Sequence, residues 1–371
     1  MQRKKTILKI TIITVLLFIS LDFLIGKAIY KKLIRKNFKD SALGYHVDDP
    51  IYDHRFKPGY NDIVGSIRYR LCTDQNGFRT SCDRINENNK KFDLGIIGDS
   101  FTEGVALNFE DTYVGMIAKE LSHLKIANLA VSSYSPAIYL TKINYLISND
   151  YKFDEIIIFL DLSDLTDDTV CYTVEKLKVK RRETANTCFE DATIKSPVDR
   201  FKIFSKNRLR LSYELYELIK NYLLKIKVIE YRPPSFKVDI RRSNWTYDYD
   251  PKNYNNYSYN ESVKIMTNHM NQLSELLKKN NIQLSIAVYP WPGTLKYDVE
   301  KNKHFKIWKS FCEKSCFKFY NLNKPFFELL EKEKLSNVLQ KYYLKNDIHF
   351  SREGSKIIAE NFLRLFKQSG H

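Results

Sequence analysis

The chain has 371 residues, of which 43% are hydrophobic and 28% charged, so it can bury the core of one α/β domain with an anchor and insertions, and wholesale disorder is excluded. The net charge of +16 would suit an anionic partner, but ten Lys and Arg residues lie within residues 1–40 against only Asp22 and Asp40. Because no basic stripe with interleaved aromatic residues and no zinc-finger pattern is present, we expect no nucleic-acid partner.

The first feature in chain order is a mostly apolar run at residues 10–25, preceded by several basic residues. This pattern predicts an uncleaved, single-pass transmembrane anchor within residues 1–29, followed by a basic juxtamembrane segment at residues 30–40. A cleaved signal peptide is the alternative, which we favour less because no small-x-small site follows before Gly26.

The side of the membrane depends on two opposing signals. More basic residues follow the apolar run than precede it, which favours a cytoplasmic domain. The six cysteines fall into three local pairs, which favours disulfides in an oxidising compartment: Cys72 with Cys82, Cys171 with Cys188, and Cys312 with Cys316. We therefore expect a periplasmic or extracytoplasmic domain on the inner membrane; a cytoplasmic domain and three pairs of free thiols remain the alternatives.

The rest of the chain alternates predicted strands and helices. A small β-rich segment at residues 41–91 precedes a domain at residues 92–371, which a long basic insertion at residues 165–262 interrupts. Within that insertion we expect a helix at 205–227, and a Tyr-rich stretch at 243–259 that is either a loop or a surface that stacks on sugars. The five apolar strands are expected at 92–98, 125–131, 155–162, 283–289 and 317–322. This alternation predicts a three-layer, doubly wound α/β fold with a parallel five-stranded sheet.

Two short motifs contain the residues of a serine nucleophile and its base. The first predicted strand ends in Gly98-Asp99-Ser100, and the carboxy-terminal loop contains Asp347-Ile348-His349. Serine is a weak nucleophile that needs a general base, usually a histidine oriented by a carboxylate. Because ligands bind at the carboxyl ends of parallel strands, we expect Ser100, His349 and Asp347 to meet there.

These motifs resemble the SGNH or GDSL hydrolase family, whose first block ends a strand in Gly-Asp-Ser and whose last block carries the catalytic Asp and His. The matching segments are residues 98–104 and 347–354, and the resemblance extends over about residues 92–366. It implies a flavodoxin-like fold with Ser100 as nucleophile, His349 as base and Asp347 as the residue that orients it. The Asp-x-His spacing is similar to that of the branch that includes polysaccharide O-acetylation enzymes.

The middle blocks of the family differ here. The family binds the oxyanion partly through a glycine amide and an asparagine side chain, and Ser133 stands at the glycine position, with Ser163 or Asp164 at the asparagine position. The resemblance therefore implies an oxyanion hole formed by Ser100, Ser133 and Ser163, although an ionised Asp164 would repel the developing charge. Trp291, after the fourth strand, is expected to line the substrate pocket.

Together these features predict ester hydrolysis or acetyl transfer on a cell-envelope glycan or lipid-linked sugar, without metal or other cofactor. The alternative is a catalytically weak or inactive protein that binds glycan during envelope polysaccharide assembly. A cation site among the acidic residues that follow the third strand is a further alternative to a solvated loop: Asp161, Asp164, Asp167 and Asp168. His54 is interpreted as structural.

Overall fold

The computed structural model describes residues 2–26, 45–64, 68–182, 208–225, 241–345 and 347–368. The chain divides into two compact units. Unit 1 combines Met1–Gly44 with Asp191–Pro234, and unit 2 combines Tyr45–Glu190 with Ser235–His371. The expected catalytic motifs all lie in unit 2.

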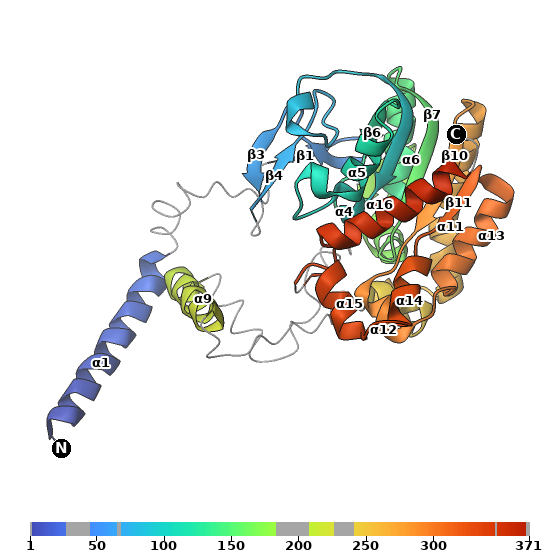
Figure 1. The fold of residues 1–371 in the computed structure, drawn as a ribbon. Coiled ribbons are helices and arrows are strands. Elements are labelled where there is room, and N and C mark those ends of the chain that lie inside the picture. Colours follow the sequence, from blue (N-terminus) through green and yellow to red (C-terminus); the bar gives the residue numbers. More distant parts are fainter. Residues whose placement is uncertain are drawn as a thin grey trace. The chain divides into compact units, whose positions relative to one another are not determined.

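Unit 2 contains a parallel sheet of five strands (Figure 1). The strands are β5 (Lys91–Gly98), β6 (Ile126–Asn128), β7 (Lys152–Leu160), β10 (Gln283–Val288) and β11 (Lys318–Asn321), in the spatial order β6-β5-β7-β10-β11. With these strands counted along the chain, the order is 2-1-3-4-5, which is that of flavodoxin-like folds. The predicted doubly wound, parallel five-stranded sheet is confirmed.

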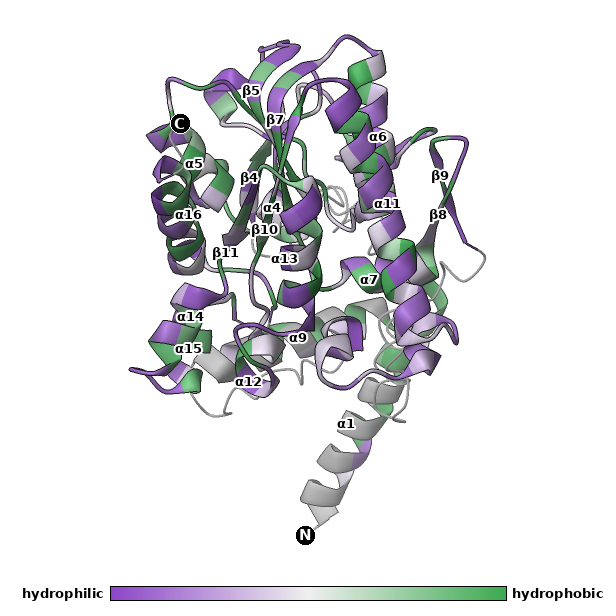
Figure 2. Cartoon of the chain, turned by 90° about the vertical axis from the view of Figure 1, so that its right-hand side faces the viewer, coloured by the Kyte–Doolittle hydropathy of each residue, from purple (hydrophilic) through white to green (hydrophobic). Residues whose placement is uncertain are grey.

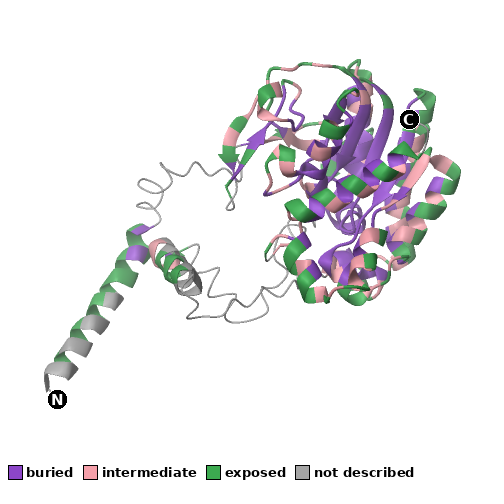
Figure 3. Ribbon diagram, in the orientation of Figure 1, coloured by how far each residue is buried: buried purple, intermediate pink, exposed green. Residues whose placement is uncertain are grey.

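Helices cover both faces of this sheet. Figure 2 shows α5 (Tyr113–Glu120) and α16 (Arg352–Lys367) together on one side, and α6 (Pro136–Ser148) and α11 (Tyr259–Lys279) together on the other. The continuous apolar run of β7 is buried throughout because both of its faces are covered (Figure 3). A fifth helix, α13 (Lys303–Ser315), packs beside β10 and β11.

Helix α6 is buried over most of its length. Its first eight residues are all buried, so its apolar positions do not form the single stripe that marks a surface helix. Short helices follow the carboxyl ends of the strands and complete the unit: α4 (Ser100–Glu103), α7 (Asp164–Thr166), α12 (Pro292–Tyr297), α14 (Lys324–Leu330) and α15 (Leu335–Tyr342).

Among the residues that the structure describes, three β-hairpins lie outside the main sheet. The predicted β-rich segment forms β1 (His46–Asp49) with β2 (Asp53–Phe56), and β3 (Asn61–Val64) with β4 (Tyr69–Cys72). The third hairpin, of β8 (Tyr172–Glu175) and β9 (Lys178–Arg181), lies within the insertion.

Two of the expected disulfides, Cys72–Cys82 and Cys312–Cys316, are present. Cys171 is also disulfide-bonded, but its expected partner, Cys188, lies outside the described residues.

Unit 1 contains two described helices, α1 (Gln2–Leu21) and α9 (Arg210–Lys225), the second within the helix expected at 205–227. A π-helical turn at Asp22–Gly26 ends α1, and the buried Asp22 carboxylate accepts hydrogen bonds from the amides of Leu211 and Ser212, at 3.0 and 2.6 Å. Asp22 therefore caps the first turn of α9.

The expected transmembrane span is not found. Across the described residues, every helix is too short or too polar to cross a membrane. In α1 the apolar part is limited to residues 10–21, between Lys9 and Asp22, whereas a span needs about 20 apolar residues. The expected juxtamembrane segment at 30–40 lies outside the described residues.

Candidate active site

Ser100 begins the short helix α4 directly after β5, at the carboxyl end of the sheet. A side chain at Gly98 would lie 2.8 Å from the carbonyl oxygen of Phe159, so the close approach of β7 requires glycine there. Asp99 caps α4 by accepting a hydrogen bond of 2.9 Å from the amide of Phe101. The turn therefore places a half-buried Ser100 at the first position of the helix.

His349 and Asp347 approach Ser100 from the segment between α15 and α16. The Nε2 atom of His349 lies 2.7 Å from Oγ of Ser100, and its Nδ1 atom lies 2.5 Å from Oδ1 of Asp347. Asp347 also accepts a hydrogen bond of 3.1 Å from the amide of His349. Ser351 caps α16 by accepting a hydrogen bond from the amide of Gly354, so the segment that carries Asp347 and His349 ends at Ser351.

The electrostatics of this pair suit a general base. Burial disfavours the charged form of His349, but the hydrogen bond and charge of Asp347 outweigh burial and raise the histidine pKa above its ordinary value. Burial likewise disfavours ionised Asp347, yet its hydrogen bonds with His349 lower the carboxyl pKa to about 2. Asp347 is thus a carboxylate at neutral pH, and it stabilises the imidazolium that forms when His349 takes a proton.

Two of the expected oxyanion donors are backbone amides, those of Ser100 and Ser133. Ser133 has φ = +64°, the left-handed region that glycine favours, so this serine takes the conformation that a glycine would have at the same position. The amide of Ser100 belongs to the first turn of α4, where helix N–H groups have no partner within the helix. Although this chain has Ser133 where the family has glycine, the backbone at this position keeps the conformation of a glycine.

The third expected oxyanion donor, Ser163, already donates its hydrogen bonds to another residue. The hydroxyl of Ser163 donates a hydrogen bond of 2.6 Å to Oδ1 of Asp161, and its amide donates to the same oxygen at 2.7 Å. The expected repulsion by Asp164 is reduced, because burial and then the charge of Asp161 raise the pKa of the Asp164 carboxyl well above its ordinary value and favour its neutral form.

Asp161 is a central residue of the site. The sequence analysis interpreted it as part of a solvated loop. That interpretation is wrong, because Asp161 and the three acidic residues that follow it are fully buried. Beside its contacts with Ser163, Asp161 accepts hydrogen bonds through Oδ2 from Tyr289 (2.9 Å) and Trp291 (2.6 Å). The sequence signal was its place immediately after β7, where functional side chains of such sheets gather.

The neighbouring carboxylates pair with protein groups. Asp167 binds Arg242 at 2.7 Å, and Asp168 lies 2.8 Å from Nδ1 of His269. No cluster of three potential metal ligands occurs among the residues that the structure describes. In the described chain these aspartates therefore act in hydrogen bonds and ion pairs.

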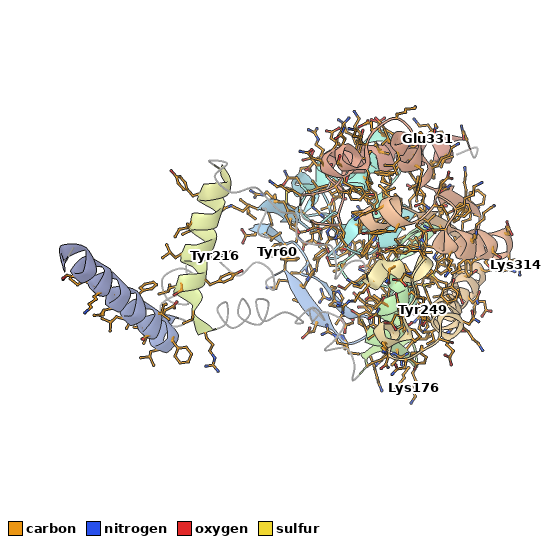
Figure 4. All side chains as sticks on the ribbon, turned by 90° about the horizontal axis from the view of Figure 1, so that it is seen from below. Tyr60, Lys176, Tyr216, Tyr249, Lys314 and Glu331 are labelled. Atoms are coloured by element: carbon orange, nitrogen blue, oxygen red, sulfur yellow. A yellow bond between two sulfur atoms is a disulfide. The ribbon has the colours of Figure 1, made fainter. Side chains whose placement is uncertain are left out.

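The expected substrate-binding role of Trp291 is not supported. The side chain is only 1% exposed, and its indole N–H is committed to Asp161. In the Tyr-rich stretch, Trp245 and Tyr254 are also buried, and Tyr249, labelled in Figure 4, stacks on Tyr254 with 4.6 Å between ring centroids. Trp245 and Tyr254 are therefore core residues, whereas Tyr249 is half-buried.

Fold and site together define the chain as a doubly wound α/β protein with serine, histidine and aspartate side chains hydrogen-bonded in series at the carboxyl end of its sheet. No family model and no curated protein matches the chain.

Similar solved structures include a putative lipolytic protein of the G-D-S-L family from Desulfitobacterium hafniense, with 16% identity over 75% of this chain and 99% of that chain and a TM-score of 0.37. Another is a psychrotrophic esterase from Pseudoalteromonas, with 10% identity, coverage of 76% and 98%, and a TM-score of 0.37. A third is an acetylxylan esterase from Geobacillus stearothermophilus, with 12% identity, coverage of 76% and 95%, and a TM-score of 0.40. At these identities and TM-scores, none of them assigns an activity to the chain.

Proposed function

We propose that the chain is a serine esterase or acyltransferase of the SGNH type. The single observation that carries the proposal is the hydrogen-bonded series from Ser100 through His349 to Asp347, which joins the end of β5 to the segment before α16. Serine, a histidine general base and a carboxylate in this order form the arrangement that activates a serine for attack on a carbonyl.

The reaction follows from this geometry. Oγ of Ser100 attacks the carbonyl carbon of an ester while Nε2 of His349 takes the hydroxyl proton. The amides of Ser100 and Ser133 hold the negative oxygen of the tetrahedral intermediate. The bond to the alcohol oxygen then breaks, His349 returns the proton to that oxygen, and an acyl group remains on Ser100. Water or a sugar hydroxyl then attacks the acyl carbonyl while His349 takes its proton. The bond to Oγ breaks, and His349 returns the proton to Ser100. Attack by water yields hydrolysis and attack by a sugar hydroxyl yields transfer.

For the substrate, we propose acetyl esters of a cell-envelope glycan or lipid-linked sugar. The disulfides Cys72–Cys82 and Cys312–Cys316 support a compartment outside the cytoplasm, where such glycans are exposed. An assay of acetate release or transfer on envelope glycans, comparing the wild type with His349→Ala, tests this part of the proposal. If the protein released acetate from p-nitrophenyl acetate but from no glycan preparation, the proposed glycan substrate would be contradicted.

We further propose that unit 1 attaches the protein to the surface of an anionic membrane. Unit 1 contains 20 of the 60 Lys and Arg residues of the chain, but only 7 of its 44 Asp and Glu residues. Unit 1 therefore carries a net charge of +13, out of +16 for the whole chain. Apolar side chains of α1 such as Leu17 (66%) and of α9 such as Leu218 (68%) are exposed. Basic charge beside exposed apolar side chains is typical of protein that lies at a lipid interface.

Vesicle sedimentation tests this attachment. We expect the protein to sediment with vesicles that contain phosphatidylglycerol, to bind pure phosphatidylcholine weakly, and to lose binding in Leu17→Glu. The matched control is Leu177→Glu, which changes a 42%-exposed leucine in unit 2. Equal sedimentation of both variants with the wild type would exclude α1 from the attachment.

The proposed chemistry is tested by labelling with a fluorophosphonate, which reacts with activated serines. We expect the wild type to be labelled and Ser100→Ala to remain unlabelled, with Ser122→Ala, an exposed serine, as the control. Absence of labelling in the wild type, or equal labelling of Ser100→Ala, would instead favour a protein that binds glycan without catalysis.

A further inference from the structure

The peptide group between Ser132 and Ser133 is held from its carbonyl side. Nε2 of His54, on strand β2, lies 2.8 Å from the carbonyl oxygen of Ser132. The carbonyl of Ser132 and the amide of Ser133 belong to one planar group, and no described peptide bond is cis. In a trans peptide the C=O and N–H bonds point in opposite directions. A hydrogen bond that fixes the Ser132 carbonyl therefore also fixes the direction of the Ser133 N–H.

Further hydrogen bonds hold both neighbours of Ser133. The amide and the hydroxyl of Ser132 each donate to Oε2 of Glu103 at 2.6 Å, and Glu103 belongs to α4, the helix that Ser100 begins. On the other side, the hydroxyl of Tyr134 donates a hydrogen bond of 2.6 Å to the carbonyl of His54. His54 thus contacts the residues before and after Ser133.

His54 is itself held in one orientation. Its ring is 12% exposed, and Nδ1 lies 2.7 Å from Oδ2 of Asp53. Arg181 donates two hydrogen bonds to the Asp53 carboxylate, at 2.7 and 3.0 Å. Burial disfavours ionised Asp53, but the hydrogen bonds from His54 and Arg181 outweigh it and lower the Asp53 pKa to about 2. The Ser132 carbonyl oxygen can only accept a hydrogen bond, so Nε2 of His54 is the donor in that contact.

We propose that His54 is a positioning residue that aims the amide of Ser133 at the oxyanion of the reaction. This inference rests on the proposed function, since it assigns a role in stabilising the same tetrahedral intermediate. A hydrogen-bond donor on the Ser132 carbonyl also polarises the shared peptide group, which makes the Ser133 N–H a stronger donor. The β1–β2 hairpin, outside the main sheet, then supports the reaction without touching the substrate.

Two substitutions distinguish positioning of the Ser133 amide from a purely structural role of His54 in holding the β1–β2 hairpin in place. The amide nitrogen of glutamine reaches about as far as Nε2 of histidine, so His54→Gln keeps a donor for the Ser132 carbonyl. The shorter asparagine reaches the position of Nδ1, so His54→Asn keeps the contact with Asp53 and loses the one with Ser132. His123→Gln, on an exposed histidine, is the control.

The experiment measures kcat and KM with p-nitrophenyl acetate as the probe, with active sites counted by complete fluorophosphonate labelling. We expect His54→Asn to lower kcat per labelled site by roughly 10- to 100-fold with KM changed less than about threefold, the loss that a misaimed oxyanion donor causes. His54→Gln is expected to restore at least about a third of wild-type kcat. Equal losses in both variants, or wild-type kcat in both, would overturn the proposal.

Tyr134→Phe provides a second measurement if either His54 variant does not fold. It removes the hydroxyl that donates to the His54 carbonyl and leaves the ring in place, and we expect kcat to fall about 3- to 10-fold at unchanged KM. An unchanged kcat would count against the proposal. Failure of the proposed function is distinguishable, because then the wild type itself would show neither labelling nor turnover.

Discussion

The Nε2 atom of His349 lies 2.7 Å from Oγ of Ser100, although 249 positions of sequence separate the two residues. Ser100 follows the first strand of the sheet, and His349 precedes the last helix. Their contact therefore depends on the whole doubly wound fold between them.

Replacing Asp347 by asparagine should abolish most of the activity without unfolding the protein. An asparagine keeps the size of the side chain, but its amide no longer stabilises the imidazolium or fixes the His349 tautomer. We expect kcat for p-nitrophenyl acetate to fall by about 10³- to 10⁴-fold, with thermal unfolding close to that of the wild type. Retention of more than about a tenth of kcat would exclude Asp347 as the orienting carboxylate.

The pH dependence of kcat/KM should report the ionisation of His349. The base must be neutral to take the proton of Ser100, and Asp347 raises the pKa of His349 above its ordinary value of 6.5 despite burial. Activity should therefore be lost as the pH falls, with the midpoint above 6.5. Because the charge of Asp161 also raises this pKa, Asp161→Asn should move the midpoint to lower pH. A midpoint below that of an ordinary histidine would contradict this assignment.

Asp161→Asn should also destabilise unit 2. The carboxylate accepts hydrogen bonds on both oxygens, and asparagine would turn an N–H donor toward either Ser163 or the pair of Tyr289 and Trp291. Leaving such buried donors unpaired should lower the free energy of unfolding by about 2–4 kcal/mol, measured by urea denaturation. Asp154→Asn, on an exposed residue of β7, is the control and should change little. Equal stability of both variants would contradict the structural role of Asp161.

The ion pair of His269 with Asp168 should make stability depend on pH. Burial alone would lower the pKa of His269, but the charge and hydrogen bond of Asp168 outweigh it and raise the pKa above 6.5. A pKa that is higher in the folded state stabilises the protein fully below the unfolded value, and this contribution is lost as the pH rises through the folded pKa.

Urea unfolding between about pH 6 and about pH 9 measures this dependence. We expect His269→Gln to remove part of the wild-type loss of stability across this window, whereas the exposed control His123→Gln should follow the wild type. The same slope in His269→Gln and the wild type would mean that the pair contributes nothing.

Local sequence determined the fold class and the three residues of the candidate triad. The buried runs at β5 and β7, and the helix of the last block, have periodicities that need no knowledge of distant contacts. The spacing Asp347-x-His349 likewise places both side chains on one side of an extended segment. Local spacing also paired Cys72 with Cys82 and Cys312 with Cys316 correctly.

Tertiary structure alone decided which polar residues are buried and what they bind. From the sequence, Asp161 resembles a loop residue. Its hydrogen-bond donors are Ser163, on its own turn, and Trp291, after a different strand. His54 is 78 positions away from the Ser132 carbonyl that it contacts. Sequence periodicity reports the faces of single elements, whereas hydrogen bonds between elements depend on side-chain directions that only the packed fold sets.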